Sequence, residues 1–188
     1  PNIEAARLLL ADAASRSRPN DDHGGEIQTM IIDIRRAYFY APSQRKTYVR
    51  LPPEDPKAAD TTLCARLEQS LYGTRDAGAN WHAAYSAFLL RVGFQQGSAN
   101  PCHFTDALRG IKGLVHGDDF LFTGSKAQLS TLRKQFEAEY ECKVEVAGYG
   151  KGVERSARFL NRVTGFSGFG ITFEADQRLV ESPGGGSW

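Results

Sequence analysis

The stretch at residues 114–124 constrains the fold most, because it places two apolar runs on either side of a short polar break. Its sequence is Leu-Val-His-Gly-Asp-Asp-Phe-Leu-Phe-Thr-Gly. This pattern predicts two buried strands joined by a tight hairpin turn at residues 116–119. Gly117 suits the turn because glycine adopts positive φ at little steric cost. The adjacent carboxylates Asp118 and Asp119 are either ordinary turn formers or ligands for a divalent cation.

A second apolar stretch, residues 27–34, carries a carboxylate near its end at Asp33. Because both faces of this stretch are apolar toward its end, we expect a central strand. A carboxylate in that position is costly unless it is paired, either with neighbouring Arg35 or Arg36 or with a bound metal ion. If this strand lies beside the hairpin, three carboxylates gather at one end of a sheet. Such a cluster needs cations and suits two-metal phosphoryl transfer.

The rest of the chain alternates irregularly between expected strands and helices, which favours an α+β fold with a mostly antiparallel sheet. Apolar periodicity predicts a helix at residues 3–15, capped by Asn2, and another with its apolar face from Trp81 to Val92. A third helix opens with a capping box at residues 125–128. The inward face of the first helix is expected to hold Ile3, Ala6, Leu10 and Ala14. Short strands are expected at residues 47–51, 63–67, 94–95, 102–105, 142–146, 158–164 and 171–173.

Composition excludes several classes of protein. The 188 residues are 41% hydrophobic with a net charge of +1, which suits one compact globular domain and leaves any basic surface local. Three cysteines without a Cys-x-x-Cys pair argue against a disulfide framework and a structural zinc site, and favour a reducing compartment. The sequence contains no apolar run of membrane-spanning length and no targeting signal, so we expect a cytoplasmic location. The chain starts at Pro1 rather than Met, so we expect a piece of a longer protein.

Several motifs occur together in a fixed order. Asp33-Ile-Arg-Arg-Ala-Tyr-Phe, Ser70-Leu-Tyr-Gly and Val115-His-Gly-Asp-Asp resemble motifs of the reverse transcriptases of Ty1/copia-class retrotransposons. Supporting matches are Tyr48-Val-Arg-Leu-Pro-Pro, Asn100-Pro-Cys-His-Phe, Leu121-Phe-Thr-Gly, and Arg158-Phe-Leu-Asn with Gly170-Ile, which resembles the primer-gripping segment. The resemblance covers residues 1–181 and implies a polymerase palm-like α+β fold with packed helices, partial fingers and a largely absent thumb. We expect residues 182–188 to form a Gly/Ser-rich disordered tail.

The resemblance also implies an activity and a set of site residues. It implies an RNA-directed DNA polymerase that adds deoxynucleotides to a primer 3′-hydroxyl with two Mg²⁺ ions, or Mn²⁺ in their place. The catalytic carboxylates implied are Asp33, Asp118 and Asp119, with the Ile34 carbonyl as a further metal ligand. Nucleotide-binding positions are Arg36, Ala37, Tyr38, Gly73 and Arg75, and primer-binding positions are His116, Gly117, Phe159 and Leu160.

Other interpretations of single residues stay open. Tyr38 matches the aromatic position that excludes a 2′-hydroxyl, and ordinary packing is its alternative. Packing is likewise the alternative for residues 159–160, and a solvated surface charge is the alternative for Arg75. The sequence departs from the family pattern at the hairpin, where His116-Gly117 replaces Tyr-Val, at residues 74–79, and at Asn161, which replaces glycine.

The implied partners are an RNA template, a DNA primer strand, deoxynucleoside triphosphates and the rest of a retrotransposon polyprotein, including integrase and ribonuclease H. No membrane partner is expected, and the resemblance implies a cytoplasmic virus-like particle. Two other functions stay open. One is a non-enzymatic remnant of a retroelement that at most binds nucleic acid, and the other is an RNA-dependent RNA polymerase of the Gly-Asp-Asp type. We expect the fragment alone to polymerise poorly, because a thumb and part of the fingers are missing from it.

Overall fold

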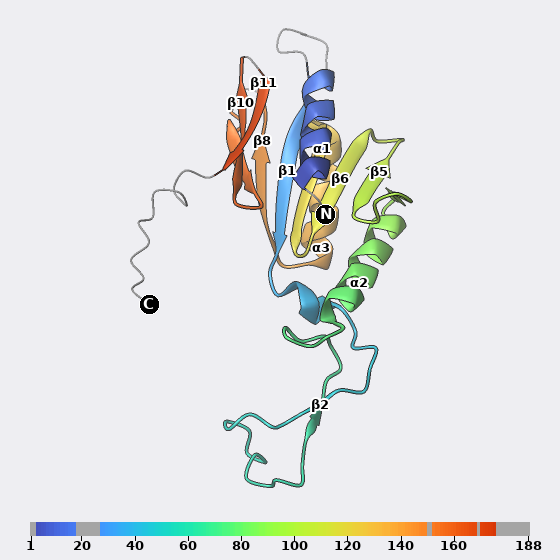
Figure 1. Cartoon of the computed structure of the whole chain (residues 1–188), viewed down its shortest axis with the longest axis vertical. Coiled ribbons are helices and arrows are strands. Elements are labelled where there is room, and N and C mark those ends of the chain that lie inside the picture. The colour runs from blue at the N-terminus through green and yellow to red at the C-terminus, as the bar shows by residue number, and fades with distance from the viewer. Residues whose placement is uncertain (1–2, 18–26, 150–151, 169, 176–188) are drawn as a thin grey trace, which may run out of the picture. The chain divides into compact units, whose positions relative to one another are not determined.

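The computed structural model describes residues 3–17, 27–149, 152–168 and 170–175 (Figure 1). The chain divides into two compact units. The first, which we call the sheet unit, combines Pro1–Arg35 with Val92–Trp188, and the second, the inserted unit, is Arg36–Arg91. The elements are α+β with mostly antiparallel pairing, as the sequence predicted.

The sheet unit is built on a six-stranded sheet in the order β4-β5-β6-β7-β1-β8. Every neighbouring pair in it is antiparallel. The strand that comes first in sequence is therefore fifth of the six, between two strands from much later in the chain. The strands are β1 (Ile27–Ile34), β4 (Gln95–Gln96), β5 (His103–Asp106), β6 (Ile111–His116), β7 (Asp119–Ser125) and β8 (Cys142–Ala147).

A smaller antiparallel sheet completes this unit. It has the order β11-β10-β9, with β9 at Ser156–Phe159, β10 at Arg162–Ser167 and β11 at Gly170–Ala175. Residues 158–164 are therefore not one strand, and that prediction was wrong. Leu160 and Asn161 both have positive φ, 53° and 57°, so they form a two-residue hairpin turn of the type I′ pattern. Residues 158–164 contain no glycine, and leucine is a rare residue at positive φ, which is why the break was missed.

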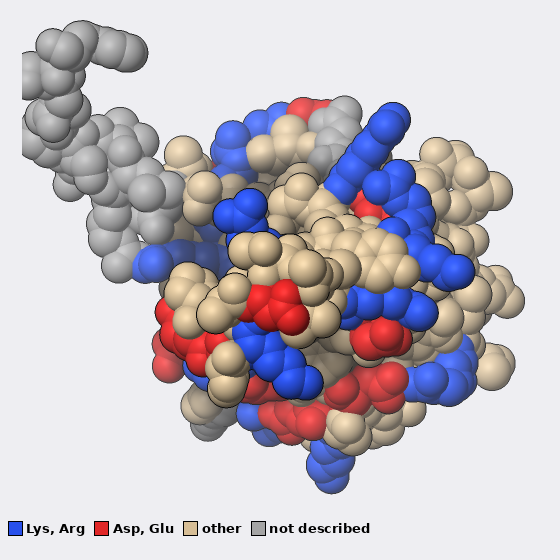
Figure 2. Space-filling model, turned by 90° about the horizontal axis from the view of Figure 1, so that it is seen from below, with Lys and Arg blue, Asp and Glu red and all other residues tan. Residues whose placement is uncertain are grey.

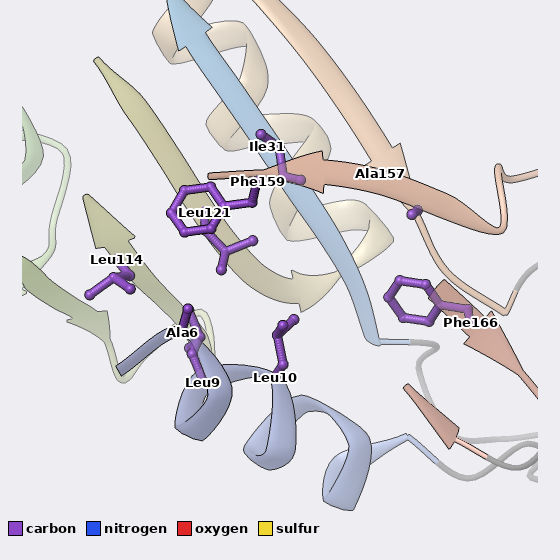
Figure 3. Packing of buried hydrophobic residues seen from close by; sticks show 10 residues of the cluster. Ala6, Leu9, Leu10, Ile31, Leu114, Leu121, Ala157, Phe159 and Phe166 are labelled. Atoms are coloured by element: carbon purple, nitrogen blue, oxygen red, sulfur yellow. The ribbon is translucent and has the colours of Figure 1, made fainter. Parts of the chain in front are cut away.

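Two helices cover opposite faces of the large sheet. Helix α1 (Ile3–Arg16) packs on one face, where its apolar side meets strands of both sheets (Figure 3). Helix α3 (Lys126–Glu139) packs on the other face, where Phe136 contacts Phe120 and Phe122 with ring centroids 5.2 and 5.5 Å away. The buried residues around α1 are Ala6, Leu9, Leu10, Ile31, Leu114, Leu121, Ala147, Ala157, Phe159 and Phe166.

The inward face of α1 differs from the one predicted. Its buried residues are Ala6, Leu9, Leu10 and Ala13, whereas Ile3 and Ala14 are only half-buried. At the polar edge of the helix, Asp12 pairs with Arg16 at 2.8 Å and with Lys112 of β6 at 2.5 Å. Only the pair with Lys112 joins the helix to the sheet, because Arg16 lies in α1 itself.

The inserted unit contains η1 (Ala37–Tyr40), β2 (Tyr48–Val49), β3 (Ala65–Arg66) and α2 (Ala77–Arg91). Helix α2 confirms the apolar stripe expected from the sequence, since Trp81, Tyr85, Phe88 and Leu89 are buried. The rings of Trp81 and Tyr85 contact edge to face at 5.5 Å.

Several boundaries shift by one or two residues from those predicted. Strands β4 and β5 start one residue later than expected, and the hairpin turn shortens to Gly117 and Asp118. Ser125 takes the N-cap position of α3, but its side chain makes no capping hydrogen bond, so the capping box is incomplete. The Asn2 cap, the boundary at residue 181 and the tail at residues 182–188 lie outside the described residues.

Two expectations from composition can be compared with the structure. All three cysteines are free, so no disulfide framework is present. Within the described ranges, no helix combines the length and the apolar character needed to cross a membrane.

Candidate catalytic carboxylate site

The hairpin between β6 and β7 is closed by the pair His116 and Asp119, with only Gly117 and Asp118 in the loop. Gly117 has φ of 63°, whereas Asp118 is not in the positive-φ region. Positive φ at the first loop residue alone is the pattern of a type II′ turn, which favours glycine at that position. This backbone requirement gives a physical reason for Gly117.

Asp33 lies directly opposite Asp119, because β1 pairs with β7 in an antiparallel ladder that runs from Ile27 and Ser125 to this pair. The amide of Ile34 donates a hydrogen bond to the carbonyl oxygen of Asp118 at 3.1 Å, so the pairing continues into the turn. The expected neighbourhood of the two strands is therefore confirmed.

The side chains at this end of the sheet are not arranged as a closed cluster. Asp33 is exposed, whereas Asp118 and Asp119 are half-buried. In the described part of the chain, no three His, Cys, Asp or Glu side chains are grouped so that they hold a metal ion together. The strand pairing therefore brings the backbones of the three aspartates together, as expected, but their side chains do not form a preformed set of metal ligands.

Electrostatics nevertheless link the three carboxylates. Burial, which is the largest cause, and the negative charges of Asp118 and Asp33 together raise the pKa of Asp119 to about 6. Carboxylate oxygens are the donors that Mg²⁺ and Mn²⁺ prefer, and a divalent cation relieves this kind of like-charge repulsion. The donor set and its charge therefore fit a divalent cation.

Two arginines, Arg35 and Arg36, follow Asp33 closely in the sequence. Arg35 pairs with Glu141 at 2.8 Å, and its backbone amide donates to the Glu141 carbonyl at 2.9 Å. Arg35 is therefore not the ion-pair partner of Asp33, and that alternative was wrong. Arg36 belongs to the inserted unit and adopts a left-handed φ of 54°.

Lys143 was not singled out from the sequence, but the register places it opposite Asp33 on β8. Asp119, Asp33 and Lys143 thus occupy one row across three neighbouring strands. The ammonium group of Lys143 pairs with Glu145 at 2.7 Å. A single lysine in an alternating strand gives no signal by itself, so only the strand order identifies this position.

The five nucleotide-binding positions expected from the resemblance all lie in the inserted unit. Tyr38 is half-buried in η1, and its ring centroid lies 4.4 Å from that of Tyr72. Gly73 follows with φ of 88°, and a Cβ there would meet no atom within 4 Å, so its backbone conformation is what disfavours a side chain. Ala37 is buried, and Arg75 is exposed.

The primer-binding positions expected from the resemblance lie in the sheet unit, but they differ in accessibility. His116 and Gly117 are exposed at the hairpin. Phe159 is only 1% exposed and packs in the core beneath α1 (Figure 3). Leu160 is half-buried at the turn, and Asn161 follows with the left-handed φ that glycine or asparagine tolerates best. The side chain of Phe159 is therefore a packing residue in this structure.

The charged surface is mixed. Figure 2 shows acidic and basic side chains interspersed over the face that it presents, in keeping with the net charge of +1. No single-sign surface dominates that view, so a strongly charged binding face is not seen there.

Comparison with known proteins connects these features to a family. Residues 2–150 match the family model described as reverse transcriptase (RNA-dependent DNA polymerase). The truncated transposon Ty1-A Gag-Pol polyprotein of Saccharomyces cerevisiae is 30% identical over 113 residues, which cover 57% of this chain and 9% of that protein. The transposon Ty1-DR5 Gag-Pol polyprotein of the same organism has the same identity over 57% of this chain and 6% of its own length. The chain therefore spans less than a tenth of the relatives that it matches. Since the match includes both strands that carry the carboxylates, the chain belongs to the reverse transcriptase family, as a domain of the Ty1/copia type.

Proposed function

We propose that this chain is the palm-centred part of an RNA-directed DNA polymerase, with Asp33, Asp118 and Asp119 as its catalytic carboxylates. The observation that carries the proposal is the direct cross-strand pairing of Asp33 with Asp119 beside a tight turn that holds Asp118. The reaction is the addition of deoxynucleotides to a primer 3′-hydroxyl on an RNA template. The match to the reverse transcriptase family favours this reaction over RNA synthesis.

The carboxylates are suited to hold two divalent cations. Asp33 and Asp118 would provide shared oxygen ligands, and the Ile34 carbonyl would provide a further one. When bound, such ions supply Lewis-acid activation of the attacking hydroxyl and neutralise charge on the leaving pyrophosphate. Asp119 supports the site as a neighbouring negative charge. Its raised pKa reflects the cost of ionising this carboxyl group beside Asp118 and Asp33 without a cation.

The incoming nucleotide would be recognised by the inserted unit. Tyr38 is the residue that we propose to select deoxynucleotides, because a ring beneath the sugar leaves no room for a 2′-hydroxyl. Its contact with Tyr72 at 4.4 Å supports the ring in one orientation. Arg36, Ala37 and the backbone at Gly73 would face the triphosphate and base pair, with Arg75 contributing positive charge.

The primer terminus would lie against the hairpin at His116 and Gly117 and against the turn at Leu160. In this proposal the partners are an RNA template, a DNA primer and the remaining parts of a Gag-Pol-type polyprotein, including integrase and ribonuclease H, in a cytoplasmic virus-like particle. The names of the relatives, which are Gag-Pol polyproteins, support that context.

Thermal melting with and without MgCl₂ tests the metal site. We expect Mg²⁺ to raise the melting temperature of the wild type and to leave the melting temperature of Asp33→Asn unchanged. Glu54→Gln is a charge-matched control, because Glu54 is an exposed carboxylate in the inserted unit, and it should retain the Mg²⁺ effect. If Mg²⁺ does not stabilise the wild type, the chain is better described as a non-enzymatic remnant.

Primer extension on poly(rA)/oligo(dT) with Mg²⁺ tests the reaction itself. We expect weak synthesis by the isolated chain and none by Asp118→Asn. Tyr38→Val should increase the use of ribonucleotides relative to deoxynucleotides. A ribonucleotide preference already present in the wild type would contradict reverse transcription and favour the RNA polymerase alternative.

A further inference from the structure

A cavity of about 310 Å³ lies in the sheet unit between α3 and the large sheet, outside the candidate catalytic site. It is lined by β1, by β8, by one side of α3 and by residues 152–154. None of its lining residues is among the catalytic, nucleotide-binding or primer-binding candidates. Its volume is at the lower end of the range in which proteins enclose small ligands.

The inner wall of the cavity is apolar. Met30 of β1 and Leu129 of α3 are both almost completely buried, and Val146 of β8 adds a branched side chain beside them. These side chains come from three different elements and form a surface without hydrogen-bonding groups. Such a wall favours an apolar body over a hydrated ion.

The side of α3 that faces the cavity is cationic. Lys126 is the first residue of this 14-residue helix, and Arg133 lies two turns further along the same side. The first turn contains no acidic residue, and the N-cap Ser125 makes no side-chain capping bond, so nothing in the side chains offsets the positive end of the helix dipole. Arg133 pairs with Glu137 at 2.7 Å, which offsets its charge and leaves Lys126 as the main cation at the cavity.

A polar group also lies at the base of the cavity. Gln28 of β1 lines it, is only 3% exposed, and has an Nε2 atom without a hydrogen-bond partner among the described residues. Buried amide groups are normally paired, so this amide leaves a donor available at the wall of the cavity. The exposed carboxylate of Glu154 lies at the rim.

We propose that this cavity binds a small ligand that combines an apolar ring system with one anionic group. The rings pack on the partly exposed Val146 and Val153, and the anionic group lies toward Lys126 at the start of α3. Glu154 opposes an anion, so its charge limits the affinity. This site is independent of the proposed polymerase activity.

Binding of anilinonaphthalene sulfonate, a dye with this combination of groups, tests the proposal with the whole chain. We expect one saturable site with increased dye fluorescence. Ser130→Phe should abolish it, because Ser130 lines the cavity and is itself exposed, so the new ring fills the cavity without replacing a core residue. Thr131→Phe is the matched control, since Thr131 is the next residue on α3, is exposed and does not line the cavity. It should leave dye binding unchanged.

Charge variants test the orientation of the anionic group. Lys126→Gln should weaken binding roughly threefold, and Glu154→Gln should strengthen it by a similar factor. Lys134→Gln removes the same charge from the same helix outside the cavity and should change nothing. Equal effects of the two phenylalanine variants, or equal effects of the two lysine variants, would overturn the proposal. The melting temperatures of Ser130→Phe and Thr131→Phe show whether Ser130→Phe folds. If it does not fold, the effects of the charge variants on dye binding test the proposal by themselves.

Discussion

Asp119 lies directly opposite Asp33 in the β1–β7 ladder, so two carboxylates share one end of a sheet whose interior is apolar. Like charges placed opposite each other destabilise a strand pair. The fold therefore carries an electrostatic cost at this position when no cation is bound, and that cost depends on pH.

The first prediction concerns the pH dependence of stability. Because the pKa of Asp119 rises from 3.8 to about 6 on folding, the folded state binds this proton more tightly than the unfolded chain does. The resulting stabilisation is complete below about pH 4 and is lost as the pH rises through about 6. In the presence of EDTA, we expect Asp119→Asn to gain about 1 to 2 kcal/mol relative to the wild type between pH 4 and pH 7, after allowance for solvent screening. Urea unfolding of both proteins measures this, and a difference that does not change with pH would contradict it.

The second prediction concerns the turn at Gly117. A Cβ at this position meets no atom within 4 Å, so the cost of a side chain there comes from the positive φ alone. We expect Gly117→Ala to lower the free energy of unfolding by about 1 kcal/mol. Gly78→Ala is the control, because Gly78 also has open space around its Cβ but lies in α2 without positive φ, and it should raise stability by about 0.5 kcal/mol. Urea unfolding measures both variants. If the two substitutions change the free energy of unfolding in the same direction, positive φ at residue 117 does not explain the effect.

The third prediction concerns Gly113, which pairs with Phe122 across β6 and β7. A Cβ at Gly113 would lie 2.5 Å from Cδ1 of the Phe122 ring, and this ring is fully buried. We expect Gly113→Ala to destabilise the protein by about 1 to 3 kcal/mol through overpacking. Phe122→Leu in the Gly113→Ala background should cost less than it does in the wild type, because the smaller side chain relieves the clash. A double-mutant cycle in urea measures this coupling, and additive effects would refute the steric explanation.

The fourth prediction concerns the turn between β9 and β10. Asn161 has φ of 57°, which alanine tolerates less well than asparagine or glycine does. We expect Asn161→Ala to reduce the melting temperature and to lower the free energy of unfolding by about 1 kcal/mol. The free energy of unfolding of Asn161→Gly should stay within about 0.5 kcal/mol of the wild-type value. If both variants lose the same stability, the Asn161 side chain matters for a reason other than its backbone conformation.

Much of the sheet unit follows from short-range sequence patterns. Strand β1 has the predicted bounds, and the β6–β7 hairpin was expected from an apolar pattern interrupted by glycine and two carboxylates. These signals are strong because a buried strand and a tight turn each restrict residue type locally. They also sufficed to place Asp33 and Asp119 together once the two strands were assumed to be neighbours.

The remaining differences depend on tertiary contacts. Leu160 adopts positive φ although leucine disfavours it, and its packing against the core beneath α1 accompanies that conformation. The ion pair that joins α1 to the sheet uses Lys112, which is distant in sequence from Asp12. Lys143 became notable only through the position of β8 beside β1. None of these relationships leaves a periodic signal in the sequence.

The position of β1 between β7 and β8 has a consequence for the synthesis of the protein. Both neighbours of this strand, β7 and β8, lie near or beyond residue 119, so β1 has no pairing partner when it leaves the ribosome. At 5–20 residues per second, the roughly 110 residues between the ends of β1 and β8 take about 6 to 20 s to appear. During that interval an apolar strand with two open edges is exposed to other nascent chains. We therefore expect the yield of soluble protein to depend on translation speed and on chaperones that hold β1 until the hairpin and β8 have emerged.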